Sequence, residues 1–128
     1  MRGYNDLNEV LISGRLTKDP EFREIPNGFA VLDFYLACNR YLRREGEEPE
    51  QLTTFVKVSV WNKRAEHYSE VLQRGDEVLV RGQLVDDNFN HEGKMTSGRL
   101  KLDNITFIKI IRFHNEKTQT ETEEVEVE

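Results

Sequence analysis

Alternation of apolar and polar residues is the feature that most restricts the fold of this chain. It is strongest over residues 53–61, where Thr54, Val56, Val58 and Val60 would share one face of an extended strand. Side chains of a β-strand point to opposite sides with a period of two, so this pattern predicts a strand with one buried face. The valines are the core candidates.

The same period recurs in four further segments, which are residues 9–16, 29–39, 76–87 and 99–111. We expect a bulge near Asp103 and Asn104, where the last segment breaks its period. Two prolines and an Asn-Gly pair mark residues 19–28 as a turn-rich connection or a hairpin. Residues 42–52 are too charged to pack and are predicted to form a long mobile loop, and residues 88–94 a hairpin tip.

One helix is expected, from Asn62 as the N-cap to about Gln73, with Gly75 as the C-terminal stop. An apolar stripe follows this segment, formed by Ala65, Tyr68, Val71 and Leu72. Five strands with one helix after the third strand is the order of the OB-fold, a small Greek-key barrel. The sequence therefore predicts an all-β, five-stranded OB-fold barrel.

The length and the charge distribution indicate a single domain followed by an acidic C-terminal segment. The chain has 128 residues, enough for one core, and no apolar run as long as a membrane span. Of 24 acidic and 18 basic residues, six Glu and one Lys follow His114, so the remainder is nearly neutral. We expect a domain over residues 1–114, a disordered acidic tail over residues 115–128, and no signal peptide or membrane contact.

Aromatic and basic residues alternate on the predicted solvent face of residues 53–61. Phe55, Lys57 and Trp61 occupy that face, and Tyr41 and Phe89 lie in polar loop surroundings. Single-stranded nucleic acid binds by stacking bases on such rings and pairing phosphates with nearby cations. The alternative that these rings pack under a loop or in an oligomer interface stays open.

Several basic residues could follow a nucleic-acid backbone, namely Arg40, Arg43, Arg44, Lys63, Arg64, Arg74, Arg81 and Arg99. Catalytic and cofactor signatures are missing from the pattern. The histidines His67, His91 and His114 have no ligand-spaced partners, and Cys38 falls on an apolar strand face. We expect a binding protein without enzymatic activity, metal or cofactor.

Five sequence segments resemble the bacterial-type single-stranded DNA-binding protein family. They are NEVLISGRLTKDPE at residues 8–21, PNG at 26–28, FYLACN at 34–39, FVKVSVW at 55–61 and LQRGDEVLVRGQL at 72–84. The resemblance runs in consistent order from about Asn8 to Ile111. It implies an OB barrel that assembles as a homotetramer, and strands that are apolar on both faces, as at Leu79 and Val85, are typical of such packing.

The resemblance also implies roles for individual residues. Stacking positions of the family fall on Phe55, Trp61 and Phe89, and the fourth falls on Leu42, so we expect Tyr41, one residue earlier, to stack. The expected phosphate contacts are Arg40, Arg43, Lys57, Lys63, Arg74 and Arg81.

Two departures from the family pattern affect the interpretation. Asp86 and Asp87 stand where the family has bases, and they should repel phosphate. The chain ends EVEVE without the terminal Pro-Phe pair through which the family recruits replication and repair proteins.

We therefore expect sequence-independent binding and protection of single-stranded DNA in replication, recombination and repair, in the bacterial cytoplasm at the nucleoid or, alternatively, in the mitochondrial matrix. An OB-fold protein-interaction module with weak nucleic-acid binding and a single-stranded RNA binder are the alternatives, because stacking residues alone do not distinguish DNA from RNA.

Overall fold

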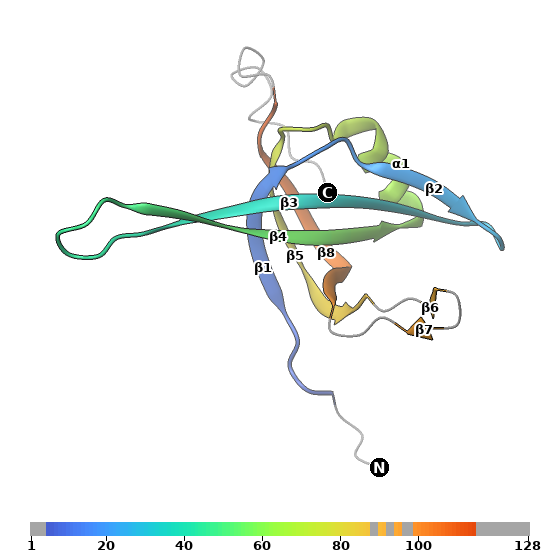
Figure 1. Ribbon diagram of the computed structural model, residues 1–128. Helices are drawn as coiled ribbons and strands as arrows, with labels where there is room; N and C mark the ends of the chain where they lie inside the picture. Colours follow the sequence, from blue (N-terminus) through green and yellow to red (C-terminus); the bar gives the residue numbers. More distant parts are fainter. Residues whose placement is uncertain (1–4, 88–89, 92–93, 96–98, 115–128) are drawn as a thin grey trace.

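The computed structural model describes residues 5–87, 90–91, 94–95 and 99–114 and forms a closed β-barrel with one helix (Figure 1). Its elements are β1 (Val10–Leu16), β2 (Glu21–Ile25), β3 (Phe29–Leu42), β4 (Glu50–Trp61), α1 (Asn62–Val71), β5 (Glu77–Asp86), β6 (Asn90–His91), β7 (Lys94–Met95) and β8 (Leu100–Arg112). The predicted acidic tail and Phe89 lie outside the described residues.

The sheet closes into a ring because β1 pairs with two strands. The strand order is β1-β5-β8-β4-β3-β2, and β1 also pairs with β3 through Arg15 opposite Ala37 and Leu16 opposite Leu36. Five strands therefore form the barrel, as expected for an OB-fold. β2 is a sixth strand that pairs only with β3, so the helix follows the fourth strand in chain order and not the third.

Ring closure brings the backbones of β1 and β3 into contact at Gly14. A Cβ on Gly14 would lie 2.8 Å from the carbonyl oxygen of Ala37, closer than real Cβ contacts allow. A second close approach is at Gly82 on β5, whose Cβ would lie 2.6 Å from Cδ1 of Ile105. The register of β5 and β8 shifts there, between Arg81 and Gln83, which confirms the bulge expected after Asp103.

Two strands run further than the sequence pattern predicted. The ladder of β3 and β4 continues to Leu42 opposite Glu50, so residues 42 and 50–52 belong to strands and the connecting loop is shorter than expected. Side-chain hydrogen bonds support this polar ribbon, since the Gln51 amide donates to Asn39 Oδ1 at 3.3 Å and Thr53 Oγ1 donates to the same atom at 2.7 Å. Figure 1 shows the ribbon projecting well beyond the barrel.

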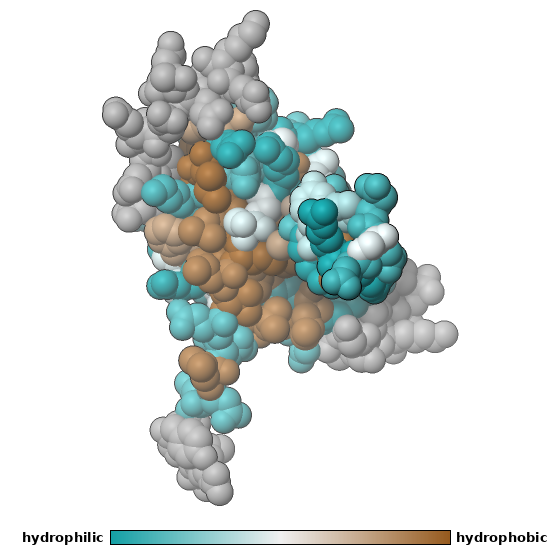
Figure 2. Space-filling view, turned by 90° about the vertical axis from the view of Figure 1, so that its left-hand side faces the viewer, coloured by the Kyte–Doolittle hydropathy of each residue, from teal (hydrophilic) through white to brown (hydrophobic). Residues whose placement is uncertain are grey.

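The outer face of β1, β5 and β8 carries several apolar side chains among charged ones, such as Arg81 and Lys109. Leu11 and Leu79 lie on its first two strands, and Phe107 and Ile111 on β8; Leu11 is 58% exposed and Ile111 38% exposed. In Figure 2 an apolar area lies beside the projecting ribbon. The sequence-based expectation that some barrel strands are apolar on both faces is therefore confirmed.

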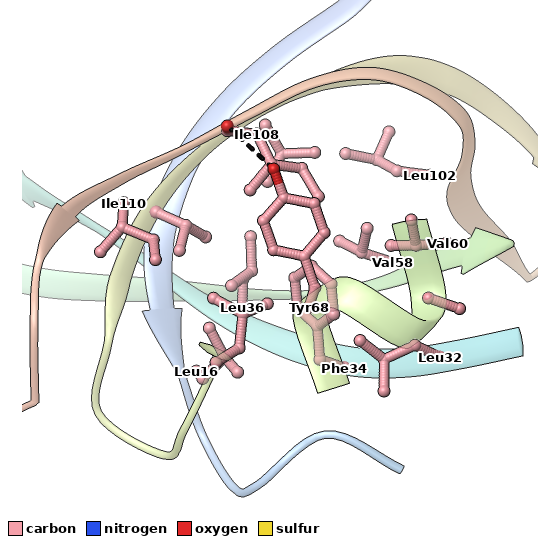
Figure 3. Close-up of a cluster of buried hydrophobic side chains, with 14 of the residues drawn as sticks. Leu16, Leu32, Phe34, Leu36, Val58, Val60, Tyr68, Leu102, Ile108 and Ile110 are labelled. Carbon is pink, nitrogen blue, oxygen red and sulfur yellow. Dashed lines mark hydrogen bonds between the residues drawn. The ribbon is translucent and has the colours of Figure 1, made fainter. Parts of the chain in front are cut away.

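The barrel interior is filled by aliphatic side chains and closed at one end by α1. Tyr68 of α1 is fully buried, and its hydroxyl donates to the Ile108 carbonyl oxygen at 3.5 Å. Figure 3 shows its ring among side chains from several strands, which include Leu16, Leu32, Phe34, Leu36, Val58, Val60, Leu102, Ile108 and Ile110. Each large side chain buried in this way contributes about 1.5–3 kcal/mol to folding.

The predicted helix boundaries need correction. α1 begins at Asn62, and Trp61 is the N-cap residue, without a side-chain capping bond. Asn62 has φ +56°, and its Oδ1 accepts a hydrogen bond from the Ala30 N–H at 3.1 Å, so its side chain joins the helix start to β3 and does not cap it. The helix ends at Val71, before Gln73, and Gly75, with φ +92°, forms the turn into β5 instead.

We predict that Gly14→Ala destabilises the protein, because the new methyl group must push β1 away from the Ala37 carbonyl. The expected loss is about 1–3 kcal/mol, seen as a lower midpoint of chemical or thermal unfolding. Ser13→Ala, one residue earlier on an exposed position, is the control and should leave the midpoint within error. Equal midpoints for the two variants would show that β1 and β3 do not approach as described.

Candidate nucleic-acid interface

The candidate rings lie on one outer face of the β3–β4 ribbon. Phe55 is opposite Ala37 and Tyr41 is opposite Gln51, and these residues share the face of Lys57 and Trp61 because all have the same strand parity. Phe55 is 69% exposed, Tyr41 72% and Trp61 38%. Leu42 has the opposite parity and is half-buried, so of these two residues Tyr41 is the one that lies on the face of Phe55 and Trp61.

The rings form a row along the ribbon and not a compact pocket. At about 3.3 Å per residue, Phe55 and Trp61 are about 20 Å apart, and the Tyr41–Gln51 pair lies about 13 Å beyond Phe55. The Tyr41 hydroxyl donates to Gln51 Oε1 at 3.1 Å, which holds that ring against its cross-strand partner. A surface of this length fits an extended ligand.

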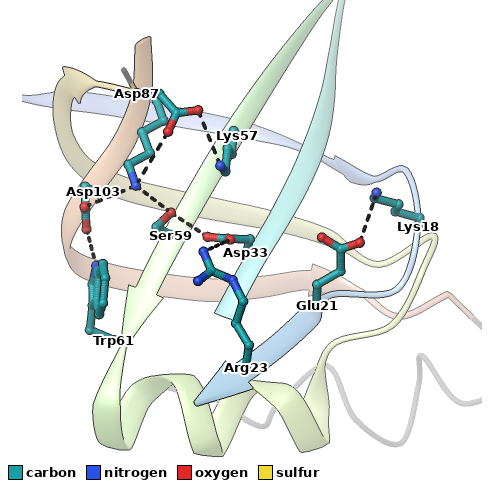
Figure 4. Close-up of polar contacts among 10 residues, drawn as sticks. Lys18, Glu21, Arg23, Asp33, Lys57, Ser59, Trp61, Asp87 and Asp103 are labelled. Carbon is teal, nitrogen blue, oxygen red and sulfur yellow. Dashed lines mark hydrogen bonds and ion pairs between the residues drawn. The ribbon is translucent and has the colours of Figure 1, made fainter. Parts of the chain in front are cut away.

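A buried polar network lies on the same face of β3 and β4, between Lys57 and Trp61 (Figure 4). Asp33 of β3 is 5% exposed and accepts hydrogen bonds from Ser59 Oγ at 2.6 Å and from Arg23 Nη2 at 3.1 Å. Ser59 is fully buried and in turn accepts a hydrogen bond from Lys101 Nζ at 3.1 Å. These bonds compensate the desolvation of Asp33, which would otherwise be costly.

Trp61 has a defined orientation at one end of the row. Its indole Nε1–H donates to Asp103 Oδ1 at 2.8 Å, and Asp103 also lies 3.7 Å from Lys101 Nζ. The hydrogen bond fixes the polar edge of the ring while 38% of the residue remains exposed. A ring held in this way loses little freedom when a ligand stacks on it.

The lysine between the two β4 rings is already paired. Lys57 Nζ lies 3.3 Å from Asp87 Oδ2, and Lys101 Nζ lies 3.9 Å from Asp87 Oδ1. The Lys57 side chain is 23% exposed and that of Asp87 24%. The aspartate expected to repel phosphate is thus in contact with the cations of this face.

The remaining expected phosphate contacts are distributed around the molecule. Arg40 is exposed on the opposite face of the ribbon, and Arg43 is exposed just beyond β3. Lys63 is exposed in the first turn of α1, beside Trp61. Arg74 lies between α1 and β5, where its backbone N–H donates to Asp19 Oδ1 at 2.8 Å. Arg81 lies on the apolar β1–β5–β8 face and pairs with Glu9 at 3.4 Å.

Other cations from the sequence have structural partners. Arg64 donates hydrogen bonds to the carbonyl oxygens of Ile105 and Thr106 in the β8 bulge. Arg44 lies 4.0 Å from Glu50 across the ribbon loop.

Sequence reasoning did not single out Lys101 or Tyr35. Lys101 reaches the polar network of Asp33 and Ser59 because it lies on the same face of β8 as Asp103. The alternation of residues 99–103 in the sequence would have predicted this shared face. Tyr35 is half-buried opposite Lys57, and Lys18 Nζ lies 4.9 Å from the centre of its ring. The sequence could have indicated Tyr35, because it alternates with Ala37 and Asn39 and so lies on the same face of β3.

Other kinds of site find no support in the described residues. No group of three or more His, Cys, Asp or Glu side chains in these ranges could hold a metal ion. Every buried side-chain nitrogen and oxygen there has a hydrogen-bond partner. No described helix is long and apolar enough to cross a membrane.

Comparison with known proteins gives a consistent result. Residues 7–108 match the family described as “Single-strand binding protein family”. The chain is 46% identical to the single-stranded DNA-binding protein of Thermus aquaticus over 83 residues, which cover 65% of this chain and 30% of that protein. It is 35% identical to the corresponding protein of Aquifex aeolicus over 119 residues, 92% of this chain and 80% of that protein.

The solved structures support the fold. A structure described as a Plasmodium falciparum SSB complex with ssDNA has a TM-score of 0.72 at 18% identity, covering 85% of this chain and 98% of that one. At this identity the likeness concerns the fold alone. The matched segments of several curated relatives, among them that of Halalkalibacterium halodurans at 52%, span about half or less of those proteins.

We predict that Ser59→Ala destabilises the fold although it removes only one oxygen atom. Buried Asp33 would lose its shortest hydrogen bond and half-buried Lys101 one partner, at a cost of about 1–3 kcal/mol. Denaturant unfolding measures this loss, and Ser13→Ala again serves as the exposed control. A free energy of unfolding equal to that of the control would contradict the proposed support of Asp33 by Ser59.

Proposed function

The chain belongs to the single-strand binding protein family, and we propose that it binds single-stranded DNA without sequence preference along the outer face of the β3–β4 ribbon. The observation that carries the proposal is the row of exposed rings at Tyr41, Phe55 and Trp61, with Lys57 between the last two. Each base stacked on such a ring contributes about 1–3 kcal/mol regardless of its identity. Binding of this kind requires no catalytic group.

Phosphate contacts complete the proposed interface. Lys57 and Lys63 flank Trp61 in sequence, and Arg43 lies just beyond Tyr41 at the end of β3, so these three fit a strand that follows the row. Arg40 lies on the opposite face of the ribbon and would contact only a strand that passes over its edge. Arg74 lies away from the ribbon and would contact only a strand that continues around the barrel. Arg81 pairs with Glu9 on the β1–β5–β8 face, so it is not proposed as a phosphate contact. Phe89 is proposed as a further stacking ring on the basis of the family pattern.

The apolar outer face of β1, β5 and β8 is the proposed interface of a homotetramer. Leu11 and Ile111 are exposed there, Leu79 and Phe107 are half-buried, and exposed apolar side chains that gather on one sheet face are typical of subunit contacts. Sedimentation velocity tests this directly: a species of four chains is expected, and a monomer at all concentrations would contradict it.

The wider role follows from the binding activity. We propose that the barrel, residues 1–114, protects exposed strands during replication, recombination and repair in the bacterial cytoplasm, with residues 115–128 as a separate acidic tail. Mapping where the protein binds on chromosomal DNA in cells under replication stress would test this role, and enrichment at single-stranded regions is expected.

We predict that Phe55→Ala weakens binding of oligothymidylate by about 5- to 150-fold, the equivalent of about 1–3 kcal/mol for one lost stacking contact. Phe22→Ala is the matched control, because Phe22 of β2 is 41% exposed but lies opposite buried Leu32 of β3, whose parity is opposite to that of the ring row. Fluorescence anisotropy of a labelled oligonucleotide measures both affinities. Equal losses in the two variants would remove Phe55 from the interface.

The function itself is tested with Trp61, the only tryptophan of the chain. The protein is titrated with oligothymidylate, oligouridylate and a DNA duplex of equal length, at low and high salt, while Trp61 emission is followed. Saturable quenching by the DNA single strand but not by the duplex is expected. Preference for oligouridylate would favour RNA binding, and no response to any of the three, with a blank gel shift, would favour a protein-interaction module.

A further inference from the structure

Asp87 is held in a fixed position directly after β5, which ends at Asp86. Its backbone N–H donates to the Arg99 carbonyl oxygen at 2.9 Å, which joins it to β8. Its side chain is 24% exposed and lies toward Lys57 of β4, as Figure 4 shows. The carboxylate therefore faces the same surface as the ring row.

The carboxylate bridges two lysines with its two oxygens. Oδ2 lies 3.3 Å from Lys57 Nζ, and Oδ1 lies 3.9 Å from Lys101 Nζ. These lysine side chains are 23% and 15% exposed, so water screens the pairs less than it screens a surface ion pair. A phosphodiester group also presents two oxygens that share one negative charge, and it would make the same charge-assisted contacts.

The position of Lys57 makes this pairing relevant to the ligand. It projects on the β4 face between Phe55 and Trp61, where the backbone of a strand stacked on both rings has to pass. Around it the described charges balance, since Arg23, Lys57 and Lys101 contact Asp33, Asp87 and Asp103. This cluster of six side chains therefore has no net positive charge to offer a phosphate.

We infer that Asp87 is a resident anion on the DNA-binding face, which occupies the phosphate position at Lys57 and Lys101 and has to be displaced or out-competed when a strand binds. The inference rests on the proposed function. It makes Asp87 a determinant of affinity: the residue weakens binding and lowers its salt dependence, because one fewer net positive charge is available to the strand.

The test compares Asp87→Asn with Asp86→Asn in the full chain, using oligothymidylate as the probe. Both variants remove one negative charge, but Asp86 is exposed at the last position of β5, and Lys57 and Lys101 pair with Asp87. Asp87→Asn is expected to tighten binding by about three- to tenfold more than Asp86→Asn. Its plot of log affinity against log salt should be steeper by about 0.7 for the additional net charge.

A double variant separates local competition from a general charge effect. If Asp87 masks Lys57, Lys57→Gln should weaken binding more in the Asp87→Asn background than in the native chain. Thermal unfolding of every variant checks that each is folded, and Asp87→Ser replaces Asp87→Asn if the asparagine variant is not.

The outcomes are distinct. Equal affinities and salt slopes for Asp87→Asn and Asp86→Asn would overturn the inference while leaving the proposed function intact. Weaker binding by folded Asp87→Asn would also overturn it, because Asp87 would then orient the lysines for the strand. If the native chain and all variants fail to bind oligothymidylate, the proposed function fails and the inference falls with it.

Discussion

The backbones of β1 and β3 approach each other at Gly14 more closely than any side chain there would allow, and the rest of the structure depends on this contact. It closes the sheet into a ring. In a small closed barrel each strand has one face inside, where side chains fill the interior, and one face outside. Apolar and polar residues alternate along the strands because successive side chains point into and out of the barrel. The outer faces are therefore available to bind a ligand or another subunit.

The paired strands β3 and β4 extend from the barrel and form the candidate interface on their outer face. Because the pairing continues without a break from Val31–Trp61 to Leu42–Glu50, rings that are distant in sequence share one face. Buried Asp33 and Ser59 make the inner part of the face rigid, and the polar ribbon extends it beyond the barrel. A long strand of nucleic acid needs a surface of this shape, whereas a small ligand needs a cavity.

Much of the fold could be predicted from the sequence, because an apolar residue at every second position over several residues is compatible with few structures other than a β-strand. The five barrel strands, the bulge after Asp103 and the solvent face of Phe55, Lys57 and Trp61 followed from it. The paired ends of the β3–β4 ribbon did not, since charged residues with no apolar face look like a loop. The role of Asn62 and the pairing of Asp87 with Lys57 and Lys101 depend on contacts between distant segments, which periodicity does not encode.

The central claim is that the outer face of the β3–β4 ribbon is where single-stranded DNA lies. It is tested most directly by recording amide and indole resonances of the full, isotope-labelled chain as oligothymidylate is added. The account predicts that the largest shifts occur at Tyr41, Phe55 and Lys57 and at the Trp61 indole. Shifts concentrated instead at Leu11, Arg81 and Phe107, on the β1–β5–β8 face, would contradict it.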